Sequence, residues 1–258
     1  MTLVHPTAMV DPRAAIAPTA AIGPGVRVEA GVRVGSGCRV LAGAVLRAGT
    51  VLGAACVVAE HAVVGGDPQD LAFDPRIPSG VSIGDGTVVR EGATIHRATV
   101  EGGVTRIGAG CLLMVQCHVA HDCELGRGVV VANFALLAGH VRIGDHAFIS
   151  GHVAIHQHCR IGRLAMVGGM TKVTQDVPPF AMVEGNPARH RGMNRVGLRR
   201  AGIRVEDRRR IAHLLKLVVA RGAARATLAR LEAESADAWR DELSTFVATS
   251  RRGVLARS

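Results

Sequence analysis

The stretch from Leu125 to Ile161 reads LGRGVVVANFALLAGHVRIGDHAFISGHVAIHQHCRI. Every sixth residue in it, counted from Leu125, is Leu, Ile or Val. The same phase runs over residues 107–173, and an equally strict period of six runs over residues 4–64. A helix would repeat its apolar residues every three or four positions, and a lone strand would alternate over only a few residues. The period of six is instead typical of a parallel β-helix.

Each six-residue repeat of such a fold supplies one short strand and one turn, and three repeats close a triangular coil. Residue i is therefore expected to stack on residue i+18, with the aliphatic position pointing inward. Two segments break the period: residues 65–80, GGDPQDLAFDPRIPSG, and residues 101–104, EGGV. Excursions from a rigid scaffold often carry function, so these segments are expected to matter for it.

The six-residue pattern ends at three prolines, Pro178, Pro179 and Pro187. Beyond them, apolar residues recur at helical spacing, as at Ile211, Leu214, Leu215 and Val218. Ser235 is the expected N-cap of a further helix. We predict two domains: a β-helix over residues 1–187, with an excursion loop at 65–80, and a small C-terminal helical domain over residues 188–258.

The composition limits the possible functions. Aromatic residues make up only 2% of the chain and glycines number 32, which suits a narrow aliphatic core. The net charge of +10 favours an anionic substrate or an acidic partner, but no nucleic-acid recognition motif accompanies it. No apolar run reaches the length of a membrane span, and the first ten residues lack signal-peptide features, so a cytoplasmic protein is expected. The six cysteines are expected as small, buried, free thiols.

Seven of the twelve histidines lie within residues 118–159, inside this aliphatic pattern. The eighteen-residue rule places four of them, with several neighbours, in three adjacent columns. The columns are Asp122, His140 and His158; His121, Gly139 and Gln157; and Ala120, Ala138 and His156. The polar members of this set are expected to cluster on one edge of the prism.

The pairing of His121 with Asp122 suggests a general base whose ring is held by a carboxylate. Gly139, one coil above His121, has no side chain, so a substrate can approach its backbone N–H closely. That N–H could stabilise an oxyanion formed by attack on a carbonyl. With no Ser or Cys nucleophile placed nearby, the pattern favours direct acyl transfer to a bound alcohol, without a cofactor.

Two other interpretations stay open at this point. Clustered histidines also suit zinc, and His118 with His121 has workable spacing for a hydratase like the gamma-class carbonic anhydrases. In that interpretation Gly139 and Gln157 have no clear role, so no metal ligand is assigned. The third possibility is a hexapeptide scaffold without enzymatic activity.

Several motifs, in order along the chain, resemble the family of acyl-carrier-protein-dependent UDP-N-acetylglucosamine O-acyltransferases, hexapeptide-repeat enzymes of lipid A synthesis. They are PQDL (68–71), TIHRAT (94–99), HVAHDC (118–123), LAGHV (137–141), AIHQ (154–157), MVGG (166–169), QDVPPF (175–180) and NRVGLRR (194–200). The resemblance implies a left-handed β-helix and a homotrimer with active sites between subunits. It also implies transfer of a 3-hydroxyacyl chain from acyl carrier protein to the glucosamine 3-hydroxyl.

The resemblance also assigns roles to residues. His121 matches the general base and Gly139 the oxyanion donor, with Asp122 beside the base. Sugar-side or acyl-side contacts match Gln69, Asp70, His118, His140, His156 and Gln157. Positions near the nucleotide or the carrier match His96, Asn194 and Arg200, and Gly169 matches a position that gauges acyl length. The acidic carrier would suit the arginines at the start of the helical domain, namely Arg189, Arg191, Arg195, Arg199, Arg200 and Arg204.

The chain departs from the family pattern at Ala72, Val196 and Ala201, where the family commonly has charged residues. The catalytic motif is intact, while contacts expected on the nucleotide side are fewer. Acyl transfer is therefore the firmer expectation, and a diamino version of the sugar nucleotide stays open as the acceptor.

Overall fold

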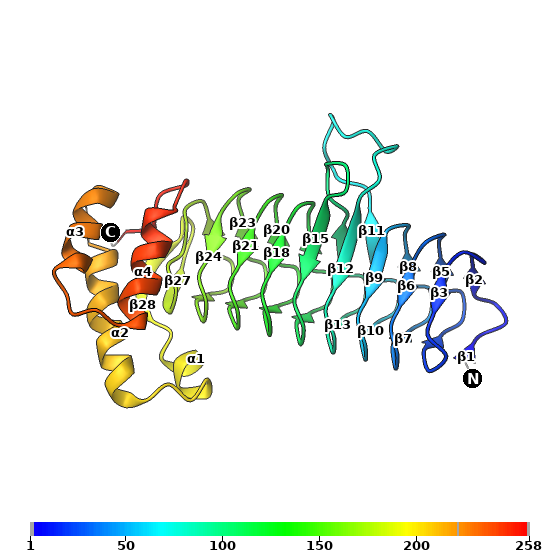
Figure 1. Cartoon of the computed structure of the whole chain (residues 1–258), viewed down its shortest axis with the longest axis horizontal. Coiled ribbons are helices and arrows are strands. Elements are labelled where there is room, and N and C mark those ends of the chain that lie inside the picture. Colours follow the sequence, from blue (N-terminus) through cyan, green and yellow to red (C-terminus); the bar gives the residue numbers. More distant parts are fainter. Residues whose placement is uncertain (1–2, 221, 257–258) are drawn as a thin grey trace.

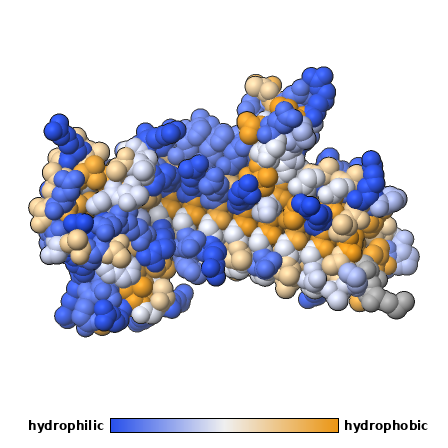
Figure 2. All heavy atoms as spheres, in the orientation of Figure 1, coloured by the Kyte–Doolittle hydropathy of each residue, from blue (hydrophilic) through white to orange (hydrophobic). Residues whose placement is uncertain are grey.

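The computed structural model describes residues 3–220 and 222–256. The chain forms a long three-sided prism of stacked coils with a helical bundle at its C-terminal end (Figure 1). Figure 2 shows a band of hydrophobic surface running along the prism, with hydrophilic surface beside it and over much of the bundle. The prediction of a left-handed parallel β-helix followed by C-terminal helices is confirmed.

Three sheets form the faces of the prism, and each face takes one strand from every coil. The first sheet contains, in spatial order, β1 (Leu3–Val4), β4 (Ala21–Ile22), β7 (Arg39–Val40), β10 (Val57–Val58), β13 (Val88–Val89), β16 (Leu112–Leu113), β19 (Val130–Val131), β22 (Phe148–Ile149), β25 (Met166–Val167), β27 (Ala181–Glu184) and β28 (Arg189–Met193). The second contains β2 (Met9–Val10), β5 (Arg27–Val28), β8 (Val45–Leu46), β11 (Val63–Gly66), β14 (Thr94–His96), β17 (His118–Val119), β20 (Leu136–Leu137), β23 (Ala154–Ile155) and β26 (Lys172–Val173). The third contains β24 (Arg160–Ile161), β21 (Arg142–Ile143), β18 (Glu124–Leu125), β15 (Val104–Ile107), β12 (Gly80–Ile83), β9 (Thr50–Leu52), β6 (Arg33–Val34) and β3 (Ala15–Ile16).

The strand register agrees with the eighteen-residue rule wherever the six-residue period is unbroken. Val119 pairs with Leu137, and Leu137 pairs with Ile155. These inward side chains are almost fully buried and form a continuous aliphatic core. All six cysteines lie in this core as free thiols.

Both interruptions of the period lengthen a coil at the same edge of the prism. Leu52 pairs with Ile83 and Ile83 with Ile107, so two successive coils are longer than eighteen residues. The extra residues lie between strands of the second and third sheets, and the longer excursion projects from the prism between β11 and β12 (Figure 1). We call this edge the loop edge; it consists of the turns at residues 67–79, 97–103, 120–123, 138–141 and 156–159.

The C-terminal part begins with a strand before its helices. Strand β28 is antiparallel to β27, and the helices that follow are α1 (Arg195–Arg200), α2 (Val205–Val218), α3 (Ala224–Glu232) and α4 (Ala238–Ala248). The first helix begins at Arg195, after strand β28. A domain boundary after residue 187 stays a prediction. The predicted N-cap Ser235 is wrong: α4 is capped by Asp237, whose side chain accepts a hydrogen bond from the Arg240 N–H.

The helical bundle is tied to the prism by charged and aromatic contacts. The Arg163 guanidinium donates two hydrogen bonds, of 3.1 and 2.8 Å, to the carboxylate of Glu242 on α4. The Arg160 guanidinium lies 4.2 Å from the centre of the Phe246 ring. None of the four helices, over the residues described, is long and apolar enough to cross a membrane.

Candidate functional site

The loop edge brings together His121, Asp122, Gly139 and His140, as the columns predicted. The turn after β17 carries His121 and Asp122, and the turn after β20 in the next coil carries Gly139 and His140. The two turns stack directly on each other, because the His140 N–H donates to the His121 carbonyl at 3.0 Å. Regular stacking therefore fixes the relative position of the two turns.

His121 and Asp122 form a close pair in a partly buried setting. His121 Nδ1 lies 2.8 Å from Asp122 Oδ2, and the two side chains are 15% and 14% exposed. When Nδ1 carries the proton and donates it to the carboxylate, Nε2 is left with a free lone pair. The pair thus has the arrangement of a general base oriented by an acid.

Gly139 lies directly against the His121 ring. A Cβ atom added at residue 139 would fall 2.6 Å from His121 Nε2, closer than real Cβ atoms come to other atoms. The Gly139 N–H has no hydrogen-bond acceptor among residues 3–220 and 222–256. The same is true of the Gln157 N–H one coil on. What distinguishes Gly139 is the missing side chain, which lets the His121 ring pack directly against it; residue 139 is itself buried in the single chain.

Asp122 is held by two threonines. Its Oδ2 accepts a hydrogen bond from Thr99 Oγ1 at 2.7 Å and another from the Thr99 N–H at 3.2 Å, while its own N–H donates to Thr105 Oγ1 at 2.9 Å. Burial alone would raise the pKa of Asp122, but the hydrogen bonds from Thr99 and His121 outweigh it and hold that pKa below the usual value. Asp122 is therefore ionised near neutral pH.

His140 and His158 continue the column above Asp122. Their rings are stacked with centroids 4.5 Å apart, and the His140 ring is perpendicular to that of His121, 5.2 Å away. His140 Nε2 lies 3.8 Å from Asp122 Oδ2. Burial lowers the pKa of His140 despite the opposing effect of Asp122, so its ring is neutral near pH 7 and can donate or accept hydrogen bonds.

His118 and His96 lie beside the pair, on the second face. His118 Nδ1 is 2.7 Å from Thr94 Oγ1, and the ring packs edge-on against His96 at 4.6 Å. Burial lowers the pKa of His118, and burial together with the neighbouring His118 and His121 lowers the pKa of His96 to about 4. Both rings are thus neutral near pH 7, which leaves His121 without a cationic histidine beside it.

The excursion loop carries Gln69 and Asp70 on the same edge, both exposed. Asp70 Oδ1 accepts from the Ala72 N–H at 2.9 Å, which closes a local turn, and Leu71 beside it is fully exposed. His156 and Gln157, one coil above Gly139, are also exposed on the loop edge. All four side chains are exposed at the loop edge, so a ligand can reach them.

Three predicted residues are not brought to His121 within one chain. Gly169 lies in the turn between β25 and β26, on the edge between the first and second sheets. Asn194 caps α1, and its side chain is occupied by bonds to the Gly197 N–H and the Leu164 carbonyl. Asn194 and Arg200 line a separate cavity of about 680 Å³ with His146.

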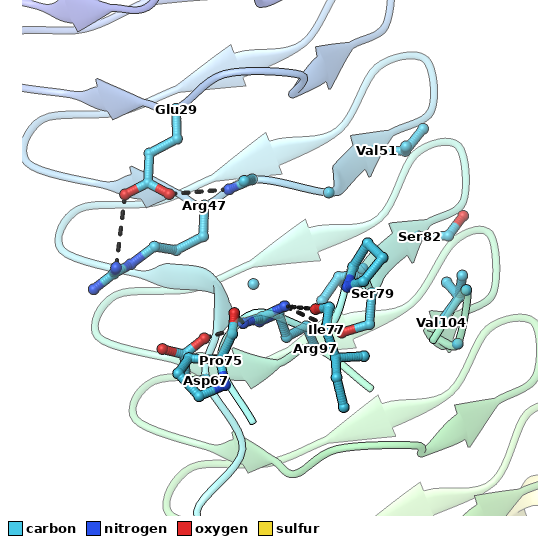
Figure 3. A pocket seen from close by; sticks show the side chains of 18 of the residues that line it. Glu29, Arg47, Val51, Asp67, Pro75, Ile77, Ser79, Ser82, Arg97 and Val104 are labelled. Atoms are coloured by element: carbon cyan, nitrogen blue, oxygen red, sulfur yellow. Dashed lines mark hydrogen bonds and ion pairs between the residues drawn. The ribbon is translucent and has the colours of Figure 1, made fainter. Parts of the chain in front are cut away.

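Arg97 anchors the excursion loop, a role that the sequence analysis did not find. Its guanidinium donates to Asp67 Oδ1 and to the carbonyls of Pro75 and Ile77, at 2.6–2.8 Å (Figure 3). It also lies over the Phe73 ring, 4.8 Å from its centre. Figure 3 shows Arg97 with Asp67, Pro75 and Ile77 in the lining of a cavity of about 790 Å³.

The geometry that could hold a metal differs from the zinc pair considered from the sequence. Within the described residues, the one group of three suitable side chains is His121, Asp122 and His140, whose ligand atoms all lie within 4.8 Å of one another. Two of these atoms are already engaged with each other, in the contact between His121 Nδ1 and Asp122 Oδ2. His118 is not part of the group.

The stacked six-residue coils define a hexapeptide-repeat transferase, and the sequence profile described as bacterial transferase hexapeptide (six repeats) matches residues 104–139. The profile described as UDP N-acetylglucosamine O-acyltransferase, Domain 2, matches residues 176–255. A curated UDP-N-acetylglucosamine O-acyltransferase from Aliarcobacter butzleri is 36% identical over 198 residues, which are 76% of each chain. The chain belongs to the UDP-N-acetylglucosamine O-acyltransferase family.

Further relatives agree along the chain. A curated member from Synechocystis sp. is 42% identical over 157 residues, 61% of this chain, and the match spans little more than half (56%) of that relative's length. The crystal structure of the Francisella novicida UDP-N-acetylglucosamine acyltransferase superposes with a TM-score of 0.95 at 33% identity, over 98% of this chain and 94% of that one. The acyltransferase from Campylobacter jejuni gives a TM-score of 0.93 at 32% identity, over 99% and 100% of the two chains.

Proposed function

We propose that this chain transfers a 3-hydroxyacyl group from acyl carrier protein to the 3-hydroxyl of UDP-N-acetylglucosamine, the first step of lipid A synthesis. The observation that carries this proposal is the placement of His121, oriented by Asp122, against the unoccupied Gly139 amide. Family membership supports the donor and the acceptor in part, because the relatives' names state an acyl carrier protein and UDP-N-acetylglucosamine; the 3-hydroxyacyl group and the 3-hydroxyl belong to the proposal alone.

The proposed reaction is a direct transfer without a covalent enzyme intermediate. His121 Nε2 removes the proton of the sugar hydroxyl as its oxygen bonds to the thioester carbon. The carbonyl oxygen becomes an oxyanion that accepts from the Gly139 N–H. When the intermediate collapses, the C–S bond breaks and the carrier thiolate takes the proton from His121. Asp122 stabilises the imidazolium during the interval in which it exists.

The remaining predicted residues are assigned to binding. Gln69 and Asp70 on the excursion loop, with His118, His140, His156 and Gln157, would contact the sugar and the acyl chain. His96 is neutral and would act at the edge of that site. The six arginines of residues 189–204 singled out above are exposed, and their positive charge would favour the acidic carrier protein.

Gly169, Asn194 and Arg200 need a second subunit to reach the site, and we infer a homotrimer. The outer positions of the first sheet support this inference, because they form an unbroken apolar column that is partly exposed in one chain. The column consists of Val57, Val88, Leu112, Val130, Phe148 and Met166. Packing of this face against other copies of the chain would cover the apolar column.

The decisive experiment is an acyl-transfer assay with 3-hydroxyacyl carrier protein and UDP-N-acetylglucosamine. We expect product from the native chain, and a rate lower by roughly 10²–10⁴-fold for His121→Ala, as typical of a lost general base. His61→Ala is the matched control, since His61 is an exposed turn histidine on another edge. Equal rates for native protein and His121→Ala would remove His121 from the mechanism.

Two further arms of the assay separate the alternatives. The reaction is repeated with the diamino analogue of the sugar nucleotide, because Ala72, Val196 and Ala201 reduce the polar contacts expected on that side; a strong preference for the analogue would change the acceptor.

Metal analysis of the purified protein tests the cluster of His121, Asp122 and His140. Stoichiometric zinc that is required for hydratase activity would replace our proposal with the metal-dependent one.

A further inference from the structure

A threonine from outside the predicted columns makes the closest contact with the acid of the pair. Thr99 Oγ1 lies 2.7 Å from Asp122 Oδ2, and the Thr99 N–H lies 3.2 Å from the same oxygen. Thr99 stands in the turn at 97–103, where the six-residue period is broken, and Ile95 therefore pairs with Val119 rather than with the residue eighteen positions on. The insertion is what brings the Thr99 side chain into this corner.

The oxygen that Thr99 holds is the same one that contacts the base. Asp122 Oδ2 accepts from Thr99 and also lies 2.8 Å from His121 Nδ1, while His140 Nε2 stands 3.8 Å away on its other side. The Thr99 hydroxyl thus holds Oδ2 at the position where it meets His121 rather than His140, while the Thr99 N–H is shared between the two oxygens, at 3.2 Å from Oδ2 and 3.4 Å from Oδ1. The Asp122 backbone is fixed separately, because its N–H donates to the fully buried Thr105.

The orientation of this carboxylate matters because it selects the tautomer of the base. With Oδ2 held next to Nδ1, the ring carries its proton on Nδ1 and offers the lone pair on Nε2, the atom that lies against Gly139. A carboxylate free to rotate would no longer favour one tautomer. A neutral ring with its proton on Nε2 cannot take the proton of a hydroxyl at that atom.

We propose that Thr99 is a positioning residue of the acyltransferase: its hydroxyl and amide aim Asp122 Oδ2 at His121 Nδ1 and so keep His121 in the tautomer that acts as a base. The inference rests on the proposed function, but it also predicts which ring nitrogen of His121 carries the proton when no substrate is bound. Thr99 touches neither the proposed substrates nor the reacting atoms; it acts through Asp122.

The kinetic test compares Thr99→Val, which keeps the amide but removes the hydroxyl, with Thr99→Ser, which restores the hydroxyl. Thr19→Val is the matched control, because Thr19 is a turn threonine whose hydroxyl accepts from the Gly37 N–H at 3.0 Å far along the prism. We expect Thr99→Val to lower kcat by roughly 10- to 100-fold with little change in KM, as for loss of one hydrogen bond to a charged group. Thr99→Ser should recover most of the rate, and Thr19→Val should lose little.

A titration of the Asp122 carboxyl gives a readout besides activity. The hydrogen bonds of Thr99 lower the pKa of Asp122, so removing the hydroxyl raises it. The midpoint of the Asp122 carboxyl signal, followed by carbon NMR against pH, is therefore expected to move to higher pH in Thr99→Val and to return in Thr99→Ser. A midpoint that stays in place, with kcat reduced equally in Thr99→Val, Thr99→Ser and Thr19→Val, would show a general structural effect and overturn the proposal.

Nitrogen NMR of the histidine rings reports the tautomer without any substrate. The His121 signal is assigned by its absence in His121→Ala. In the native protein we expect Nδ1 to be protonated, and in Thr99→Val a mixture of the two tautomers. An unchanged tautomer in Thr99→Val overturns the positioning role. If the native chain shows no acyl transfer but the tautomer changes as expected, the proposed function fails and the positioning role stands.

Discussion

At the scale of single residues, the histidines in the turns of the prism are there for two different reasons. Five histidines adopt a left-handed backbone conformation, with φ between 56° and 63°: His61, His140, His146, His152 and His158. Such corners favour Gly, Asn, Asp and His, so this preference alone accounts for those at 61, 146 and 152. His121 is not among them, and its neighbours Asp122 and Gly139 are what set it apart.

Replacing Gly139 tests how tightly the base and the amide are packed. The backbone at Gly139 does not need a positive φ, so the conflict in Gly139→Ala is the contact between the new Cβ and the His121 ring. We expect a loss of about 1–3 kcal/mol in the free energy of unfolding, as for overpacked sites, and a large loss of acyl transfer. Urea unfolding measures the first quantity.

The double variant Gly139→Ala with His121→Ala is the control for that experiment. Removing the ring removes the contact, so the second alanine should cost much less in the His121→Ala background than in the native chain. Equal costs in both backgrounds would mean that the Gly139 Cα and the His121 ring are not in contact.

The residues that were predictable from the sequence are those within the unbroken period. His121, Asp122, Gly139, His140 and His158 follow from stacking every eighteen residues, which holds from 107 to 173. Thr99 and Arg97 could not be placed, because the period fails between β14 and β15 and the stacking rule gives no partner there. The hydrogen bonds that hold Asp122 and the excursion loop both come from that short segment.

At the scale of elements, the excursion loop is held by side chains rather than by secondary structure. The Arg97 side chain is only 12% exposed, and it bonds Asp67 and two loop carbonyls at once. The end of the loop is held separately, because Ser79 Oγ donates to the Ala98 carbonyl at 2.6 Å, and the remainder makes local turns such as the one closed by Asp70. The position of the outer part of the loop relative to the base therefore depends on Arg97.

Arg97→Ala is expected to release the loop and leave the prism intact. Amide exchange of residues 67–77 should become at least about tenfold faster, because three hydrogen bonds from the guanidinium are lost together. Exchange in β17 and β20 should not change. Acyl transfer should fall mainly through a higher KM, since Gln69 and Asp70 would no longer be held near the substrate.

Arg76→Ala serves as the comparison, because Arg76 belongs to the same loop but is 89% exposed in its ion pair with Asp74. Exposed pairs of this kind contribute little, so exchange and activity should stay close to native. If Arg76→Ala and Arg97→Ala behave alike, Arg97 is not the anchor.

The start of α4 shows why helix boundaries were harder to predict than the coils. Ser235 and Asp237 are both good N-cap residues, and the sequence alone does not separate them. Arg210 of α2 decides, because it donates to Asp237 Oδ2 at 2.7 Å and to the Ser235 carbonyl at 2.7 Å. A contact with another helix, distant in the sequence, therefore decides at which residue α4 begins.

At the scale of the whole molecule, the faces of the prism differ in chemistry. The outer positions of the first sheet are apolar over six successive coils, whereas those of the third sheet include Arg33, Arg106, Glu124, Arg142 and Arg160. An apolar face of this length is expected to be covered. The proposed trimer would cover it with other copies of the chain.

Phe148→Glu tests the trimer, because it places a charge in the middle of the apolar face. Sedimentation should show a shift from trimer towards monomer, since burying an unpaired charge is costly. Transfer activity should fall with it, because Gly169, Asn194 and Arg200 would no longer be supplied by a neighbour. The control is Val51→Glu, at an outer position of the third sheet, which should remain trimeric. A trimer that persists in Phe148→Glu would mean that the subunits contact each other through another face.

Both chain insertions enter at the same corner, and this has a consequence for how such a protein can vary. A turn between two strands can lengthen without altering either ladder, so the coils before and after it keep their register. Residues inserted in these turns therefore lie on the same edge as the base, and the strands of the prism stay unchanged. Substrate preference could then diverge through one loop, with the proton-transfer chemistry inherited unchanged.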